Sequence, residues 1–253
     1  MQSNAMQFRL LTYNIHKGIG GLDRRYDLAR IVDTIAHYQP DVAMLQEVDD
    51  GAPRSLLHCQ VEMLAESLAL PHRSFQRNVR LKIGHYGNAL LSRFPLTDVV
   101  DLDLTIPFKK RRAALVARAH VPVGEGTRTV AIANVHLGLA GFKRSMQLRR
   151  LLGAECVSHT REQTPLIIGG DFNDVYSNIG RRVMRPAGFE LASGHGRTFP
   201  AAAPLRCLDR VFFRGNVQPF AAFVGHTATA RRASDHLPLI VDFELSEPTN
   251  GVT

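Results

Sequence analysis

The 253-residue chain contains no tryptophan and only three cysteines, Cys59, Cys156 and Cys207. The cysteines lie far apart and form no C-x-x-C pair, so they match neither a zinc site nor a redox motif. We expect them to be small buried hydrophobic residues, and their odd number suits a reducing compartment. No apolar run approaches the roughly 18 residues that a membrane-spanning helix needs. These absences exclude a disulfide scaffold and an integral membrane protein, and they predict a cytoplasmic one.

The sequence also lacks an internal repeat, a low-complexity tract and a long linker. Its length suits one large domain or two small ones, and 45% apolar with 21% charged residues is a globular composition. No basic segment followed by a long apolar run opens the chain, so no secretory signal is expected. Residues 1–5 resemble the remnant of an expression tag before Met6. We therefore expect one domain over residues 6–247 and a tail over 248–253.

Acidic residues are outnumbered: 23 Asp and Glu stand against 31 Lys and Arg, which gives a net charge of +8. Such an excess favours an anionic partner, which can be nucleic acid, an acidic lipid surface or a small phosphate compound. The basic residues gather in short clusters at 109–112, 149–150, 181–182 and 231–232. A single cluster of this kind is more typical of a solvated face than of a binding site. Charge alone therefore names no substrate.

Short apolar runs bounded by turn residues predict buried strands at 7–12, 42–45, 89–91, 113–120, 129–135, 166–168, 208–213 and 237–245. Apolar residues at helical spacing predict helices over 27–38, 53–68 and 143–159, and Asp27 is a suitable N-cap for the first. Helices alternate with strands, yet several strands between residues 89 and 135 follow one another directly. This mixture predicts an α/β sandwich with mixed sheets and not a Rossmann fold or a barrel.

Polar residues stand at the ends of six predicted strands, and four of them are carboxylates. Ligand sites in α/β sheets lie outside strand ends, so these residues can meet in one cleft. A lone Asn or Asp at such a place is usually a turn residue, but burying several carboxylates without cations costs several kcal/mol each. A shared metal ion resolves that cost. The strand ends carry Asn14, Gln46–Glu47, Asn134–His136, Asp171–Asn173, Asp209 and Asp235–His236.

The residue types indicate which metal and which reaction. Carboxylates and amides without a Cys or His cluster favour a hard cation, Mg²⁺ or Mn²⁺. Asp171 and Asn173 are two positions apart, so on an extended segment both face the same way. A protonated His236 would stabilise charge on a phosphoryl oxygen, and Asp209 would orient it and raise its pKa. A metal, an oriented water and a cationic histidine are the equipment for phosphate ester hydrolysis.

The chain resembles the endonuclease/exonuclease/phosphatase superfamily in seven short motifs. They occur in the superfamily's order and span nearly the whole chain. That superfamily includes pancreatic-type deoxyribonuclease, exonuclease III-type abasic-site nucleases, inositol polyphosphate 5-phosphatases and neutral sphingomyelinases. The resemblance implies a four-layered α/β sandwich, in which two mixed β-sheets pack face to face with helices outside. The motifs are Thr12-Tyr13-Asn14, Leu45-Gln46-Glu47, Gly87-Asn88-Ala89 with Ser92-Arg93, Asn134-Val135-His136, Gly170-Asp171-Phe172-Asn173, Leu208-Asp209-Arg210 and Ser234-Asp235-His236.

The resemblance also implies a role for each residue around the metal and the attacking water. Glu47 would be the principal metal carboxylate, and Asn14 and Asp235 would lie close to the ion. Asp171 would position or deprotonate the water.

Four further residues would act on the phosphate. By the same resemblance, His236 would stabilise the pentacovalent transition state with Asp209 as its orienting partner, and Asn173 would hold the scissile phosphate. His136 would contact that phosphate from the other side. In the deoxyribonuclease branch a glutamate on a preceding strand orients the matching histidine, whereas residues 79–93 here contain no carboxylate. We therefore expect His136 to be a neutral hydrogen-bond donor and not a general acid.

A closer likeness is to small bacterial members of the superfamily, some of which are associated with phospholipid metabolism and are similar to a domain implicated in remodelling lipid anchors. It implies that Lys17 and Arg112 bind phosphate alongside Asn88, although surface charge explains the first two equally well. The likeness rests on three motifs, YNIHKG at 13–18, HYGNA at 85–89 and TFP at 198–200.

These inferences lead to a metal-dependent phosphoester hydrolase that acts as a monomer. The first hypothesis for its substrate is nucleic acid, because phosphate contacts supply most non-specific affinity. The second is a phospholipid headgroup, a lipid anchor or an inositol phosphate, since positive charge serves an anionic membrane surface equally well. A basic stripe through the cleft would favour nucleic acid, while exposed apolar residues around its mouth would favour peripheral membrane contact. A third reading, a catalytically inactive binding module, conflicts with the presence of Glu47, Asp171 and His236.

Overall fold

Two six-stranded β-sheets form the centre of the computed structural model, which describes residues 5–107 and 111–246. The structure does not describe most of the tag-like start or the C-terminal tail. Two residues of the first basic cluster, Lys109 and Lys110, also lie outside the described residues. The first sheet has the order β11 (Gln218–Val224), β12 (Leu239–Leu245), β1 (Met6–Asn14), β2 (Val42–Asp50), β4 (His85–Ser92), β3 (His72–Arg80). The second has the order β5 (Leu96–Asp103), β6 (Ala113–Val123), β7 (Gly126–His136), β8 (Leu166–Asp171), β10 (Asp209–Arg214), β9 (Glu190–Leu191).

The sheets are mixed, as the sequence predicted. In the first sheet β1 and β2 run parallel, in the second β7 and β8 do, and all other neighbouring strands of the two sheets pair antiparallel. A parallel pair needs a crossover, and each crossover carries a helix that covers the outer face of its sheet. These are α1 (Leu28–Tyr38) between β1 and β2, and α3 (Gly141–Gly153) with α4 (Glu155–Ser158) between β7 and β8.

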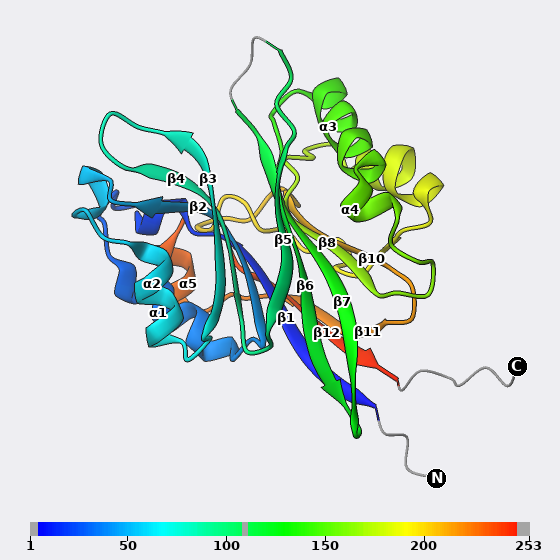
Figure 1. Ribbon diagram of the computed structural model, residues 1–253. Helices are drawn as coiled ribbons and strands as arrows, with labels where there is room; N and C mark the ends of the chain where they lie inside the picture. The colour runs from blue at the N-terminus through cyan, green and yellow to red at the C-terminus, as the bar shows by residue number, and fades with distance from the viewer. Residues whose placement is uncertain (1–4, 108–110, 247–253) are drawn as a thin grey trace, which may run out of the picture.

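Four layers result, which confirms the predicted fold class (Figure 1). One apolar cluster fills the space between the two sheets and includes Leu10, Met44 and Ile132. A second lies between the first sheet and its helices α1, α2 (Gln60–Ser67) and α5 (Ala228–Ala233), and a third lies between the second sheet and α3 and α4. Side chains that alternate along each central strand therefore enter two different cores. Within the described residues, no helix has both the length and the apolar character needed to cross a bilayer.

Two predicted helices are shorter in the structure than the sequence indicated. The helix predicted over 53–68 is a 3₁₀ turn at Pro53–Ser55 followed by α2, because Leu56 and Leu57 adopt left-handed backbone angles between them. The helix predicted over 143–159 breaks into α3 and α4 at Ala154, whose ψ is 140°.

The three cysteines also differ from the prediction. Cys59 is exposed, and Cys156 and Cys207 are partly exposed, so the expectation of buried thiols was wrong.

Gly170 holds the two parallel strands β7 and β8 in register next to the strand ends described below. Its φ is +139°, and a Cβ at this position would lie 2.0 Å from the carbonyl oxygen of Val135. The clash is with backbone, so no side-chain rotation relieves it. We expect Gly170→Ala to destabilise the protein by at least ~3 kcal/mol, which lowers the melting temperature of a chain of this size by roughly 6–12 °C. Thermal unfolding followed by circular dichroism measures the shift.

Gly153 provides the matched control for this substitution. It closes α3, and a Cβ there would meet nothing within 4 Å, so Gly153→Ala should leave the melting temperature unchanged or raise it slightly. Equal melting temperatures for the two variants would contradict the steric argument.

Candidate active site

The polar strand ends meet at one edge of the sandwich. His136, Asp171 and Asp209 are aligned partners at the ends of β7, β8 and β10. In the first sheet, Asn14 at the end of β1 pairs in register with Gln46 of β2. The amide nitrogen of Asn14 donates to Oδ2 of Asp171 over 3.2 Å and so joins the two sheets. The convergence of strand ends on one cleft was the central inference from the sequence.

Asp171 lies at the centre of this cluster and is 2% exposed. Its Oδ2 lies 3.6 Å from Nε2 of His136 and 3.8 Å from Nε2 of His236. Its Oδ1 accepts a 2.9 Å hydrogen bond from the backbone N–H of Asn173. Asn173 adopts a left-handed φ of 51°, and its amide donates to the carbonyl of Leu137. Asp171 and Asn173 therefore meet through this tight turn and not as neighbours on an extended strand.

His236 is held in place by Asp209, as predicted. Nδ1 of His236 lies 2.8 Å from Oδ2 of Asp209, and both residues are buried. The ring of Phe199 packs against the imidazole with centroids 5.0 Å apart, and Thr198 bonds to the backbone on either side of the pair, at Asp209 and Leu237. The motif at 198–200, which carried no predicted role, thus fixes the orientation of His236.

The two histidines beside Asp171 differ in charge at neutral pH. Burial alone would lower the pKa of His236, but the charges of Asp209 and Asp171 outweigh it and raise that pKa to about 10. Burial lowers the pKa of His136 to about 4, and the nearby Arg112 guanidinium contributes to the same effect. His236 is therefore a cation and His136 a neutral imidazole. Burial also raises the pKa of Asp171, although both histidines oppose it.

Glu47 reaches this edge because of a β-bulge. Between β2 and β4 the two residues Gln46 and Glu47 stand opposite Asn88 alone. Along β2, Leu45 and then Val48 pack in the helix-covered core, so the bulge removes Glu47 from the position that strict alternation would have buried. Glu47 itself has a left-handed φ of 56°. Strain of this kind at a non-glycine residue is typical of functional sites.

Lys17 is the immediate partner of Glu47: its ammonium contacts Oε2 of the carboxylate. Burial would raise the pKa of Glu47, but the charges of His136 and Lys17 overcome it and lower the pKa to about 2. Because His136 is neutral at pH 7, Lys17 supplies the lasting positive charge there. Lys17, which was predicted to bind phosphate, is thus seen bound to the predicted metal carboxylate.

The remaining predicted residues are placed as follows. Asp235 lies beside the loop after β1: its Oδ1 is 4.0 Å from Nδ1 of His16, and its side chain is 32% exposed. Ser234, to which no role was assigned, donates to the carbonyl of Asn14 and accepts from the backbone N–H of His236. The amide of Asn88 donates to the carbonyl of Ala113 in the other sheet, so its nitrogen joins the sheets.

Gln46 and Asn134 form a second link between the sheets that sequence reasoning did not interpret. Nε2 of Gln46 donates to Oδ1 of Asn134 over 2.7 Å, and the Asn134 amide donates in turn to the carbonyls of Leu45 and Ala89. Both side chains are fully buried. Their position in otherwise apolar strands, one residue before Glu47 and two residues before His136, is the signal that indicates such a role. They hold the two halves of the site at a fixed distance.

The comparisons with known proteins agree with this geometry. The sequence profile of the Endonuclease/Exonuclease/phosphatase family matches residues 11–236. This chain belongs to the endonuclease/exonuclease/phosphatase family. The Escherichia coli strain K12 protein YbhP is 32% identical over 256 residues, which cover 96% of this chain and 99% of YbhP. Members of the family are hydrolases that act on phosphoester bonds.

Solved structures of other family members share the fold. An endonuclease/exonuclease/phosphatase from Beutenbergia cavernae superposes with a TM-score of 0.75 at 25% identity, over 94% of this chain and 72% of that one. The TDP2 structure from D. rerio, solved with a single-strand DNA product, superposes with a TM-score of 0.66 at 20% identity, over 94% of this chain and 98% of that one.

The donors at the edge fit a hard cation, which members of the endonuclease/exonuclease/phosphatase family typically use. No three His, Cys, Asp or Glu side chains gather as a metal cluster in the described parts of the chain. Mg²⁺ does not need such a cluster, because it is usually held by one or two carboxylates together with waters and substrate oxygens. Glu47, with a pKa near 2 and a cation already at its Oε2, is a carboxylate suited to that role.

Asp209→Asn should move the alkaline limit of activity in this family member. Burial has the largest effect on the pKa of His236 and lowers it. The charge of Asp209 has the next largest effect and raises that pKa. Removing it should lower that pKa, so His236 loses its positive charge at lower pH. If that charge takes part in catalysis, activity is lost at lower pH as well. We expect the alkaline limb of the kcat/KM profile to shift to lower pH by one unit or more. An unchanged limb in the variant would show that His236 does not titrate there.

Proposed function

We propose that the protein is a divalent-metal-dependent phosphodiesterase, with Mg²⁺ or Mn²⁺ as its cofactor. The observation that carries the proposal is the group around Asp171: a buried carboxylate with a cationic histidine, a neutral histidine and an asparagine amide within 4 Å. Such a group has both a proton acceptor and a preformed positive charge, which a phosphoryl transfer needs.

Each residue of this group has a defined task in the proposed reaction. Asp171, whose pKa is raised by burial, orients the attacking water and accepts its proton. His236 stabilises the charge that develops on the phosphoryl oxygens, and Asp209 keeps it protonated and oriented. His136 is neutral and donates a hydrogen bond to the phosphate. Asn173 holds the phosphate from the turn after β8.

Three residues would hold the metal ion. Glu47 supplies the ionised carboxylate, and Asn14 and Asp235 lie on the neighbouring strand end and loop. The ion, when bound, neutralises charge on the phosphate and lowers the pKa of a coordinated water. Lys17 and Arg112 add fixed positive charge on the same side: Lys17 contacts Glu47, and Arg112 lies close enough to His136 to lower its pKa.

Nucleic acid is the first candidate substrate. The net charge of +8 supports it, because phosphate neutralisation supplies most non-specific affinity for a polyanion. The TDP2 structure, which shares the fold, was solved with a single-strand DNA product. The fold likeness is a reason to test DNA and RNA first.

A phospholipid headgroup is the second candidate, and the surface around the site favours it. We call the loops at residues 15–27, 51–59, 81–84, 137–140, 172–179 and 192–208 the catalytic-edge loops, because they adjoin the strand ends that carry the site. Large apolar side chains are exposed on all of them and on the first turn of α3. They are Leu22, Leu56, Leu57, Ile83, Leu139, Phe142, Val175, Tyr176 and Leu205.

The opposite edge of the sandwich, at which β1 begins and β12 ends, differs (Figure 1). Among the described residues, its loops at 39–41, 68–71, 93–95, 124–125, 159–165 and 215–217 carry no exposed large apolar side chain. The catalytic-edge loops also expose Arg24, Arg54, Lys82 and Arg197. Apolar tips interleaved with cations suit an anionic lipid surface. Most of these tips are aliphatic, and aliphatic side chains cannot stack on bases as aromatic ones do.

An activity screen with Mg²⁺ and with Mn²⁺ tests the proposal. Plasmid DNA, RNA, an abasic duplex, phosphatidyl lipid vesicles and inositol phosphates are offered side by side, with Glu47→Ala as the blank. Metal-dependent cleavage that the blank lacks supports a phosphodiesterase, and the substrate cleaved decides between the two candidates. No cleavage of any of these phosphoesters by the wild-type protein with either metal would overturn the proposal.

A further inference from the structure

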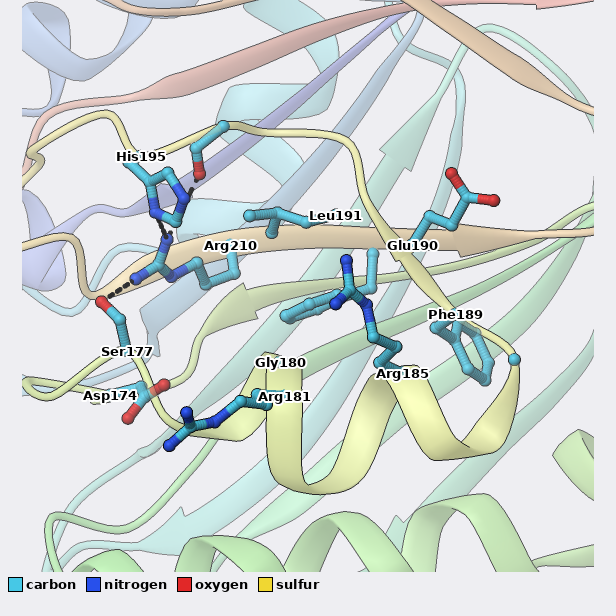
Figure 2. A pocket seen from close by; sticks show the side chains of 13 residues that line it. Asp174, Ser177, Gly180, Arg181, Arg185, Phe189, Glu190, Leu191, His195 and Arg210 are labelled. Atoms are coloured by element: carbon cyan, nitrogen blue, oxygen red, sulfur yellow. Dashed lines mark hydrogen bonds between the residues drawn. The ribbon is translucent and has the colours of Figure 1, made fainter.

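A cavity of about 840 Å³ lies on the outer face of the second sheet. Its floor is β10, and its walls are a short π-helical turn at Gly180–Met184, the strand β9 and the loop that follows it. Figure 2 shows Arg210 at one end of the cavity and Phe189 at the other.

Arg210 is the unusual residue of this cavity. It is 4% exposed, and its guanidinium donates to Oγ of Ser177 over 2.5 Å and to the carbonyl of Gly194 over 3.2 Å, with Nδ1 of His195 at 3.5 Å. Ser177 and Gly194 supply neutral oxygens, and among the described residues Arg210 forms no ion pair with a carboxylate within 4 Å. A guanidinium cannot lose its proton to escape burial, so a buried one normally has an anion beside it.

Arg144 shows what the same protein does with another buried arginine. It is 3% exposed, and its guanidinium lies 3.8 Å from Oδ1 of Asp174. Asp174 also lines the cavity: its Oδ2 accepts from the backbone N–H of Ile179, and its Oδ1 faces the Arg144 guanidinium without a hydrogen bond. Arg210 is therefore left facing the cavity without a counter-ion from the described chain.

Two further arginines line the cavity. Arg181 and Arg185 project from the helical wall, and Figure 2 shows Arg185 reaching from that helix towards β10. Glu190 is the remaining acidic residue of the lining, and it lies at the far end from Arg210 (Figure 2). Phe189 and Phe212 supply apolar surface beside these charges.

The cavity begins next to the candidate active site. Arg210 directly follows Asp209, which orients His236, and Asp174 directly follows Asn173. Consecutive side chains of a strand point to opposite faces of its sheet, so Arg210 lies on the outer face of β10 and Asp209 on the inner face. A substrate that reaches both must therefore pass around the edge that the catalytic-edge loops form. Ser177 and His195 belong to the catalytic-edge loops and are exposed, which puts this end of the cavity at the same edge as the site.

We propose that this cavity binds a second phosphate group of the substrate, one that is not cleaved, with Arg210 and Arg185 as its ligands. The inference rests on the proposed phosphodiesterase function and narrows it to substrates with two phosphates. The shared chemistry is a phosphate on a short organic linker. A neighbouring nucleotide supplies it in nucleic acid, and a ring phosphate supplies it in a phosphoinositide headgroup.

The first test measures binding without catalysis. Pyrophosphate is titrated into the full-length protein in the presence of EDTA, and Kd is determined by calorimetry. We expect Arg185→Gln to weaken binding about tenfold, and Arg210→Lys, which keeps the charge but loses the planar fork, to weaken it similarly. Arg182→Gln removes an equal charge from the same helical turn outside this cavity and should leave Kd unchanged. Absence of pyrophosphate binding, or equal weakening by the Arg185 and Arg182 variants, would overturn the proposal.

The second test measures selectivity. A dinucleotide with and without a 5′-phosphate, and glycerophosphoinositol with and without a ring phosphate, are compared as substrates. In Arg185→Gln the ratio of kcat/KM for the two-phosphate substrate to that for the one-phosphate substrate should fall about tenfold in the pair that the enzyme uses. An unchanged ratio would overturn the subsite. If the protein binds pyrophosphate through Arg185 but cleaves none of the four compounds, the phosphodiesterase function fails while the anion site stands.

Discussion

His236→Gln is expected to lower kcat by at least ~100-fold without unfolding the protein. The imidazole is a buried cation that Asp209 orients through a 2.8 Å contact and that faces Asp171 at 3.8 Å. A glutamine fills similar space but carries no positive charge, so the charge that develops on the phosphoryl oxygens loses its stabilisation. Steady-state kinetics on the substrate found in the screen measures the loss.

A structural role and a catalytic role for His236 predict different results. A structural role would lower the melting temperature along with the rate, whereas the catalytic role lowers kcat and leaves the fold intact. His159→Gln is the control, because His159 is exposed beyond α4 at the opposite edge of the sandwich. A His236→Gln enzyme that keeps near wild-type kcat would show that the site assignment is wrong.

The central strands were predictable from sequence because both of their faces are buried. Ile167 of β8, for example, packs between the sheets while Ile168 packs under α3 and α4, so the strand shows as a continuous apolar run. The same holds for β1 and β2. The family resemblance implied the four-layered arrangement, whereas the strand pairing, with β1 parallel to β2 and β7 parallel to β8, was not predicted.

The strands that sequence reasoning missed, β3, β5, β9 and β11, are the four edge strands of the two sheets. An edge strand is half exposed, and its pattern is harder to recognise. In β5 the apolar residues are mixed with Asp98, Asp101 and Asp103, while in β11 a short apolar run at 220–224 is largely exposed. In β11, Pro219 stands at a register shift, and proline is tolerated there because an edge strand has free N–H positions. The physical cause of the misses is therefore exposure.

The convergence of the polar strand ends was predictable, but the geometry in which they meet was not. Residues such as Asp209 and His236 were identifiable because charge at the end of an apolar strand is costly unless it has a partner. The bulge at Glu47 and the left-handed turn at Asn173 were not, since each depends on how neighbouring strands pair. The same limit applies to Arg210: its position in the sequence, next to Asp209, does not show that it is buried without a carboxylate.

Glu47→Ala should abolish metal-dependent turnover. At a metal concentration that saturates the wild-type protein, we expect the kcat/KM of the variant to be at least ~100-fold lower. The carboxylate is ionised at all physiological pH values, because its pKa is about 2, and the bulge presents it at the edge where Asn14 and Asp171 meet. Its loss removes the principal oxygen ligand of the proposed ion. Glu155→Ala, which removes an exposed carboxylate from α4, is the control and should behave as wild type.

A measurement of metal affinity distinguishes a metal-binding role of Glu47 from a role as the ion-pair partner of Lys17 alone. If Glu47 holds the ion, Glu47→Ala should also weaken Mn²⁺ binding, measured by titration of the paramagnetic ion, and raised metal should recover part of the lost rate. If Glu47 serves only as the partner of Lys17, the variant should bind Mn²⁺ as the wild type does and should not respond to added metal. Unchanged Mn²⁺ affinity would therefore remove Glu47 from the metal site, and the contact between Lys17 and Glu47 would then be a structural ion pair.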